Sequence, residues 1–360
     1  MSGGTYDRNE TYREESYTSA DSDAERRRLL AKREERIKGF RSEIGEKADK
    51  PRPTRDVRRD YNAEYVRKAV TQPAPGVKRV YVVLIDNSGS NQKIANHFRN
   101  STNYLRVNLG LVDPEAQYVF VYFSDHCDGD QWWQAVDYIS PTLEGEKVMT
   151  STLFHIDDAD GGDRPEAHEC ALLDACGFNF GEVTERHLIL ISDVTGHGMG
   201  MQGDNGCRYQ RDWQTSLDNV EKIYQTFEMI GCGDDPDVAE LQQQFIAYQH
   251  PELLKMNFIS LAHIKNSGHR LGIVLNAFLF LVARHRGMQT VEGFLSRLYE
   301  KWINDPVFGG DTDRRAKEAI LRFAKYVPGQ SEETRSMMSR VLVTTPAEID
   351  DLLKQGAVLI

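Results

Sequence analysis

Three oxygen-bearing side chains on alternate residues follow the first long apolar segment of the chain. They are Asp86, Ser88 and Ser90, and Asn87 and Gly89 separate them. One carboxylate and two hydroxyls in a tight turn can converge on a hard cation such as Mg²⁺, which takes near-octahedral oxygen ligands at about 2.0–2.1 Å. Taken alone the pattern is weak evidence, because Asp and Ser are common turn residues and Ser90 could instead cap the following helix.

Two further acidic features strengthen the prediction of a metal site. Asp193 follows the apolar run 187–191, just as Asp86 follows the run 80–85. A dense group of carboxylates also surrounds the Gly161-Gly162 pair, and its members are Asp157, Asp158, Asp160, Asp163, Glu166 and Glu169. Like charges at this density repel one another unless a cation or water relieves them. Together these features favour a bound cation over simple helix capping.

In this order the features resemble the metal-ion-dependent adhesion site of von Willebrand factor A domains. The resemblance rests on the Asp86-x-Ser88-x-Ser90 turn, the loop 161–166 and the strand-ending Asp193. The loop, Gly-Gly-Asp-Arg-Pro-Glu, is similar to the G-G-D-x-P-E loop of a bacterial and alpha-kinase-associated branch of that family. An alpha-kinase catalytic domain is not expected, because nothing late in the sequence shows a glycine-rich phosphate loop with a companion lysine.

The resemblance implies a ligand set for one divalent cation, Mg²⁺ or else Mn²⁺ or Ca²⁺. It implies direct bonds from both serines and from Glu166, waters held by Asp86 and Asp193, and one open position for an Asp or Glu of a partner protein. Many family members use a threonine of the second loop, for which Thr150 or Thr152 could be offered, but both lie far from the Gly-Gly turn and Glu166 is preferred. The predicted metal residues, of which Asp163 is the weaker contributor, are Asp86, Ser88, Ser90, Asp163, Glu166 and Asp193.

Apolar periodicity predicts the elements that would position these residues. Continuous apolar runs at 80–85, 118–123 and 187–191, and another near 257–264, are typical of strands buried on both faces. Helical spacing at residues 94–112, 167–176 and 213–229 places helices between these strands. The alternation predicts an α/β fold with a doubly wound, mostly parallel sheet, a Rossmann-like architecture whose ligand sites lie at the carboxyl ends of the strands.

The two ends of the chain differ from the central domain, which we expect to span residues 77–265. Residues 1–76 are expected to form a charged arm, partly disordered. A helix near residues 22–45 of the arm is predicted by apolar side chains at heptad spacing, Leu30, Ile37 and Ile44. Residues 266–360 are expected to form a helical extension that packs on or next to the central domain, beginning with an apolar helix at 271–283.

Composition limits the partners and the compartment. The 360 residues carry a formal net charge of −11, and the acidic excess lies after residue 75, which disfavours nucleic-acid binding by the main domain. No apolar stretch reaches the roughly 20 residues of a membrane span, and the first 50 residues have no apolar signal-peptide core, so we expect a cytoplasmic protein. The five cysteines are scattered without a C-x-x-C pair, which argues against a disulfide framework and against a thiolate zinc site.

These observations favour an interaction protein over an enzyme. The leading hypothesis is a metal-dependent protein-interaction module that offers the cation to a partner carboxylate, and its family resemblance implies an adaptor, with an AAA+ ATPase assembly as one class of partner. The first alternative is a metal-dependent hydrolase, since a carboxylate-rich Mg²⁺ site can activate water. That hypothesis lacks a recognisable nucleophile or general base. The second alternative is a structural subunit whose metal only stabilises the fold.

Overall fold

The computed structural model describes the chain between residues 27 and 287, with gaps. The described residues are 27–28, 30–32, 34–35, 37–38, 70–126, 128, 132–153, 165–197, 206–249, 254–261 and 270–287. The loop that contains Asp163 and the helices expected after residue 287 lie outside them.

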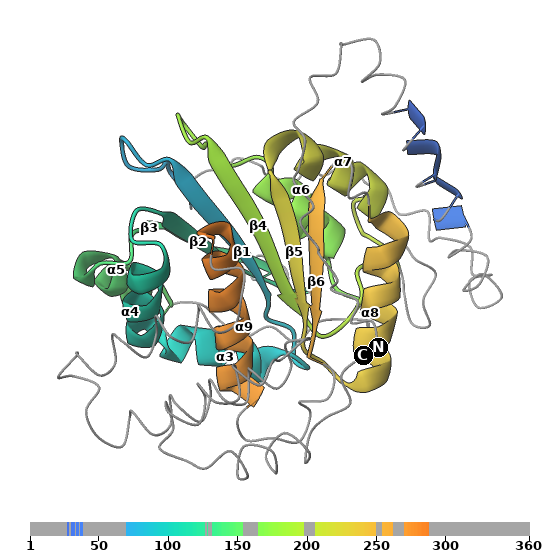
Figure 1. Cartoon of the computed structure of the whole chain (residues 1–360). Coiled ribbons are helices and arrows are strands. Elements are labelled where there is room, and N and C mark those ends of the chain that lie inside the picture. The colour runs from blue at the N-terminus through green and yellow to red at the C-terminus, as the bar shows by residue number, and fades with distance from the viewer. Residues whose placement is uncertain are drawn as a thin grey trace, which may run out of the picture.

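A six-stranded sheet forms the centre of the fold, and its strand order is β3-β2-β1-β4-β5-β6 (Figure 1). All neighbouring strands pair in parallel except β2 and β3, which are antiparallel. The strands are β1 (Arg79–Asp86), β2 (Gln117–Phe123), β3 (Trp133–Ile139), β4 (Glu185–Ser192), β5 (Thr226–Gly231) and β6 (Lys255–Ser260). This arrangement confirms the predicted α/β fold with a doubly wound, mostly parallel sheet.

Helices cover both faces of the sheet. They are α3 (Gln92–Asn100), α4 (Thr102–Val112), α5 (Leu143–Leu153), α6 (His168–Ala175), α7 (Trp213–Ile223), α8 (Asp235–Tyr248) and α9 (Arg270–His285). One hydrophobic cluster joins Tyr81, Val83 and Ile85 of β1 to α3, α4 and α9. The residues between them, such as Val82, face a second cluster with α6, α7 and α8. Side chains alternate along a strand, so a continuous apolar run supplies both faces at once.

The strands β1, β2, β4 and β6 and the helices α6, α7 and α9 lie where the sequence predicted them, and the helix expected over 94–112 is divided into α3 and α4. The sequence analysis did not predict β3, β5, α5 or α8. The helix expected over 213–229 ends at Ile223, and residues 226–231 form β5 instead. Helical spacing does continue into the strand, because Val220, Tyr224 and Phe227 are three or four residues apart. The segment is nevertheless a strand because its backbone pairs with β4 on one side and β6 on the other. The expected apolar helix at 271–283 is confirmed as α9.

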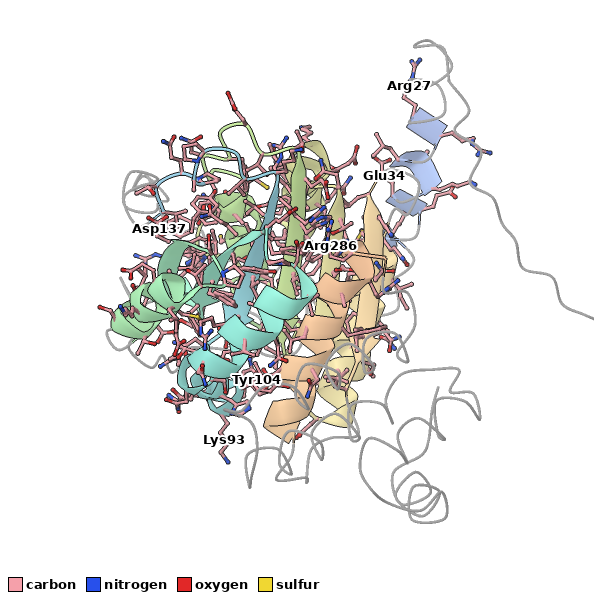
Figure 2. The ribbon with its side chains drawn as sticks, turned by 60° about the vertical axis from the view of Figure 1, so that its left-hand side comes forward. Arg27, Glu34, Lys93, Tyr104, Asp137 and Arg286 are labelled. Carbon is pink, nitrogen blue, oxygen red and sulfur yellow. The ribbon has the colours of Figure 1, made fainter. Side chains whose placement is uncertain are left out.

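Beyond the central sheet, the described residues of the arm between 27 and 38 are helical. Ile37, from the predicted heptad stripe, is buried and belongs to the second cluster. In Figure 2, Lys93 of α3 lies at the end of the molecule where β1 finishes, whereas Arg286 lies toward the opposite end. Among the described residues, no helix is long and apolar enough to cross a bilayer.

Candidate functional site

The carboxyl ends of β1 and β4 place two of the predicted metal residues side by side. Ile85 pairs with Ile191 in the parallel ladder, so Asp86 and Asp193 both emerge at the same edge of the sheet. The turn after β1 is closed by Asn91, whose side-chain amide donates to the Asp86 carbonyl at 2.7 Å. The edge where ligands bind in doubly wound sheets is therefore where these carboxylates meet.

Asp86 is fully buried, and hydrogen bonds hold its carboxyl group in place. Its Oδ1 accepts from the Ser88 backbone N–H at 2.9 Å, and its Oδ2 accepts from Ser192 Oγ at 2.7 Å. Burial raises the pKa of this carboxyl, while the bonds from Ser192 and Ser88 act in the opposite direction. The carboxylate is thus fixed in orientation within a site that penalises its charge.

The two serines of the turn bring their hydroxyls to the same point. Ser88 Oγ lies 3.4 Å from Ser90 Oγ, and Ser90 Oγ donates to Asp193 Oδ1 at 3.1 Å. Ser90 does not cap the next helix, since Asn91 is the N-cap residue of α3. Ser88 is buried and Ser90 is exposed, so the hydroxyl pair reaches from the interior to solvent.

Glu166 completes the group from a different part of the chain. It forms a parallel β-bridge with Gly196, and its N–H donates to the Thr195 carbonyl at 3.0 Å. The side chain is 3% exposed, and Oε2 has no hydrogen-bond partner among the residues that the structure describes. Burial, and then the charges of Asp86 and Asp125, raise the pKa of Glu166 well above its ordinary value, although a hydrogen bond with Ser88 lowers it. A buried carboxyl oxygen with no protein partner, facing other oxygen donors, fits a hard cation.

Five of the six predicted metal residues therefore converge, and Asp163 lies outside the described residues. The threonine alternatives are placed elsewhere: on α5, Thr150 Oγ1 donates to Thr102 Oγ1 at 3.1 Å, and Thr152 Oγ1 donates to the Val148 carbonyl at 2.9 Å. The converging donors are all oxygens, as Mg²⁺, Mn²⁺ and Ca²⁺ require.

Two residues behind the site were not predicted from the sequence. Ser192 Oγ, which donates to Asp86, lies 3.0 Å from His168 Nε2. Because the hydroxyl proton goes to Asp86, the bond to His168 requires the imidazole N–H on Nε2. Burial lowers the pKa of His168 to about 3, so the ring is neutral. Of these two residues, only Ser192 could have been found from the sequence, because it directly precedes Asp193 at the end of the strand.

A buried ion pair borders the same edge. His197 Nε2 lies 2.9 Å from Asp125 Oδ1. Burial alone would raise the pKa of Asp125, but the hydrogen bond and charge of His197 outweigh it and lower the pKa to about 2. His197 thereby joins the loop after β2 to the loop after β4.

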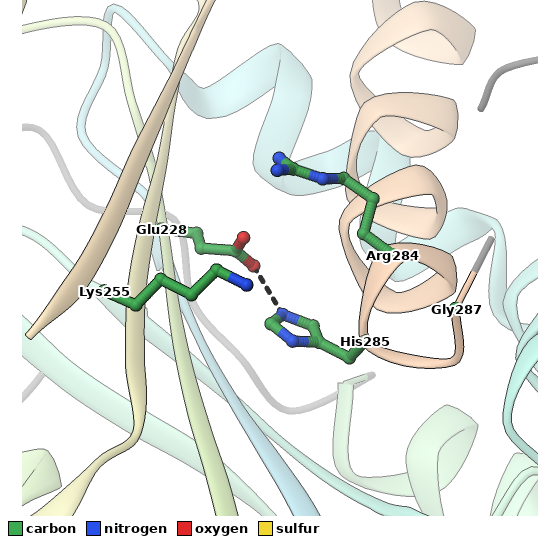
Figure 3. Close-up of a pocket in the computed structure, with 5 residues that line it drawn as sticks. All are labelled: Glu228, Lys255, Arg284, His285 and Gly287. Atoms are coloured by element: carbon green, nitrogen blue, oxygen red, sulfur yellow. Dashed lines mark hydrogen bonds and ion pairs between the residues drawn. The ribbon is translucent and has the colours of Figure 1, made fainter. Parts of the chain in front are cut away.

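The hollow in Figure 3 does not coincide with this group. It is lined by Glu228, Lys255, Arg284, His285 and Gly287. Its residues come from the amino-terminal halves of β5 and β6 and from the end of α9, where His285 Nε2 lies 2.8 Å from Glu228 Oε2. Of the predicted metal residues, Asp86, Ser88, Ser90 and Asp193 lie instead at the carboxyl ends of β1 and β4, and Glu166 is bridged to the loop after β4.

No family model and no curated protein matches the sequence. Solved structures with similar folds include the pilus adhesin SpaC from Lactobacillus rhamnosus GG in its open conformation, at 15% identity and a TM-score of 0.39, covering 60% of this chain and 31% of that chain. A von Willebrand factor type A structure from Catenulispora acidiphila has 13% identity, a TM-score of 0.37 and coverages of 57% and 42%. The PilB minor pilin from Streptococcus sanguinis has 11% identity, a TM-score of 0.38 and coverages of 59% and 63%.

The chain thus spans between about a third and two thirds of these chains. The Catenulispora acidiphila structure is of the domain type that the sequence motifs resemble. At such identities and TM-scores, the function of this chain has to be argued from its own residues.

Proposed function

We propose that this protein is a metal-dependent interaction module of the von Willebrand factor A type, which binds one divalent cation at the carboxyl ends of β1 and β4. Ser88, Ser90 and Glu166 are the direct ligands, and Asp86 and Asp193 hold coordinated waters. The observation that carries the proposal is Glu166 Oε2, a buried oxygen left without a partner among the described residues while it faces the Asp86 carboxylate.

When bound, the cation supplies a concentrated positive charge that a carboxylate of a partner protein can approach from solvent. The exposed Ser90 marks the accessible side of the site. The protein's own groups keep the ligands in place: Ser192 orients Asp86, and the Asn91 amide closes the turn. We further propose that the partner belongs to a larger assembly, for which an AAA+ ATPase complex is one candidate.

A hydrolase is less well supported by the same geometry. Ser192 and His168 form the nearest serine–histidine pair among the described residues, but both are completely buried. The Ser192 hydroxyl donates its proton to Asp86 in a hydrogen bond, and the buried hydroxyl is not accessible to a substrate. The described part of the chain therefore offers this site no accessible nucleophile with an adjacent base.

Calorimetric titration with Mg²⁺ and Mn²⁺ tests the cation site. Asp86→Ala and Ser88→Ala should each lower the affinity at least tenfold, because hard-cation affinity depends on the number and charge of the ligands. Ser101→Ala, between α3 and α4, is the control for loss of a serine hydroxyl and should bind as the wild type does. Unchanged affinity in both site variants would refute the site.

The partner step needs a separate measurement. Pull-down from the native cell extract should recover a protein in Mg²⁺ that is absent in a chelator and absent with Asp86→Ala. Replacing one Asp or Glu of that protein by its amide should then abolish the capture. Capture that is equal with and without the cation would contradict metal-mediated recognition and leave the structural-subunit alternative.

A further inference from the structure

A second group of ligand-type side chains lies beside the oxygen-lined site, and it has a different chemistry. Three separate segments contribute to it: the loop after β2 provides His126, the first turn of α6 provides Glu169 and Cys170, and the segment before α7 provides Cys207. Their ligand atoms all lie within 4.8 Å of one another. Sequence spacing does not indicate this group, because its members are 43, 1 and 37 residues apart.

The distances within the group match a tetrahedral metal centre. Cys170 Sγ and Cys207 Sγ are 3.4 Å apart, and His126 Nε2 lies 3.2 Å from the first sulfur and 3.9 Å from the second. Around tetrahedral zinc, with Zn–S of about 2.3 Å and Zn–N of about 2.0–2.1 Å, sulfurs are about 3.8 Å apart and a nitrogen and a sulfur about 3.6 Å apart. The observed separations are close to both values.

An independent observation concerns Glu169. Its side chain is completely buried, and Oε1 has no hydrogen-bond partner in the described part of the chain. Its other oxygen accepts from the His197 backbone N–H at 3.2 Å. A carboxyl group is rarely buried unless each oxygen is paired or coordinates a metal. The unpartnered oxygen belongs to the residue next to Cys170, which is one of the four members of the group.

The surroundings fix the imidazole and exclude water. The His126 ring packs edge-on against Trp132 and Tyr209, with centroids 4.5 and 4.6 Å away. Trp132 is 6% exposed and His126 is 3% exposed. A histidine held this firmly presents Nε2 to the sulfurs without rearrangement, as ligands of structural sites do.

We propose that His126, Glu169, Cys170 and Cys207 bind one structural zinc ion. Two thiolates select a softer metal than the oxygen site does, and four protein ligands leave no position for a substrate. The ion would tie the loop after β2, the start of α6 and the segment before α7 into one unit. Because Asp125 precedes His126, and Glu166 is three residues before Glu169, the zinc site also braces the edge that carries the oxygen ligands.

The test is the zinc content of the full chain, purified in reducing buffer from zinc-supplemented medium and measured by elemental mass spectrometry. About one zinc per chain is expected in the wild type. Cys170→Ser and Cys207→Ser should lose it, whereas Cys176→Ser should keep it, since the Cys176 thiol donates to the Leu172 carbonyl instead. Asp86→Ala should also keep the zinc, which separates this site from the proposed cation site.

A measurement on the wild type alone covers the case in which the cysteine variants do not fold. Replacing the metal with Co²⁺ should give the intense visible bands of a tetrahedral ion and a sulfur-to-cobalt charge-transfer band in the near ultraviolet. A wild type that contains no zinc as isolated and that shows neither feature on adding Co²⁺ overturns the proposal. A Cys170–Cys207 disulfide in protein isolated without reductant also overturns it, as does full zinc content in Cys207→Ser.

Discussion

Replacing Glu166 with glutamine should have opposite effects on the metal-free and the metal-loaded protein. Glu166 is buried against Asp86, and its Oε2 is unpartnered among the described residues. Leaving a buried polar atom unsatisfied costs about 1–3 kcal/mol. An amide keeps the shape, cannot ionise and can donate toward Asp86. At about 2–4 °C per kcal/mol for a domain of this size, the metal-free variant should melt roughly 2–12 °C above the wild type.

The pH dependence follows from the raised pKa of Glu166. Between the ordinary pKa of a glutamate and this raised value, the folded protein retains a proton that the unfolded chain has released. Stability contributed by this group therefore falls as pH rises through that window. Glutamine does not titrate, so the advantage of the variant in a chelator should grow from pH 5 to pH 7.5.

With excess Mg²⁺, the wild type should melt at a higher temperature than Glu166→Gln. A ligand at 100 times its Kd stabilises the folded state by about 2.7 kcal/mol. The wild type should gain this stabilisation, and Glu166→Gln should gain little of it, because it lacks the charged ligand. Thermal melts followed by circular dichroism, in chelator and in excess Mg²⁺ at both pH values, measure both effects.

The matched control is Glu228→Gln, another buried glutamate on the sheet. Both of its oxygens have partners, since Asn257 Nδ2 donates to Oε1 at 3.0 Å and His285 Nε2 lies 2.8 Å from Oε2. This variant should be destabilised in chelator and should respond to Mg²⁺ as the wild type does. If Glu166→Gln behaved in the same way as this control, Glu166 would not be a metal ligand.

Three further substitutions probe the residues around the site. Ser192→Ala removes the hydroxyl that orients Asp86, so Mg²⁺ affinity should fall about 10- to 100-fold in calorimetry; an unchanged Kd would contradict that role. Gly233→Ala places a Cβ 2.5 Å from the Asp193 carbonyl oxygen, which should destabilise the fold by about 1–3 kcal/mol in urea unfolding and weaken Mg²⁺ binding. If neither stability nor Mg²⁺ affinity changed, Asp193 would be free to move. Asp125→Asn breaks a buried ion pair and should lower the free energy of unfolding by about 3 kcal/mol at pH 7. Because the Asp125 pKa is about 2, this loss of stability should persist down to about pH 4 and vanish as the pH falls through 2. A loss of stability that is independent of pH would refute this role of the ion pair.

Local patterns were sufficient to predict the strands β1, β2, β4 and β6 and the turn after β1. The runs at 80–85 and 188–191 are continuously apolar, which favours strands covered on both faces, and a parallel pair places Asp86 and Asp193 at one edge. The positions of the Ser88 and Ser90 hydroxyls beside Asp86 could be predicted from the same turn. These conclusions depend on periodicity and on sequence neighbours, which are visible without a structure.

The strand β5 and the sulfur-containing group required the tertiary fold. Residues 226–231 have apolar side chains at helical spacing, and only backbone pairing between β4 and β6 makes them a strand. Scattered cysteines argued against a thiolate site, yet the fold brings Cys170 and Cys207 to 3.4 Å. The physical reason is that contacts between residues far apart in the chain depend on how the loops close around the sheet. No local pattern encodes that closure, so the sequence alone could determine the oxygen-rich turn but not the site assembled beside it.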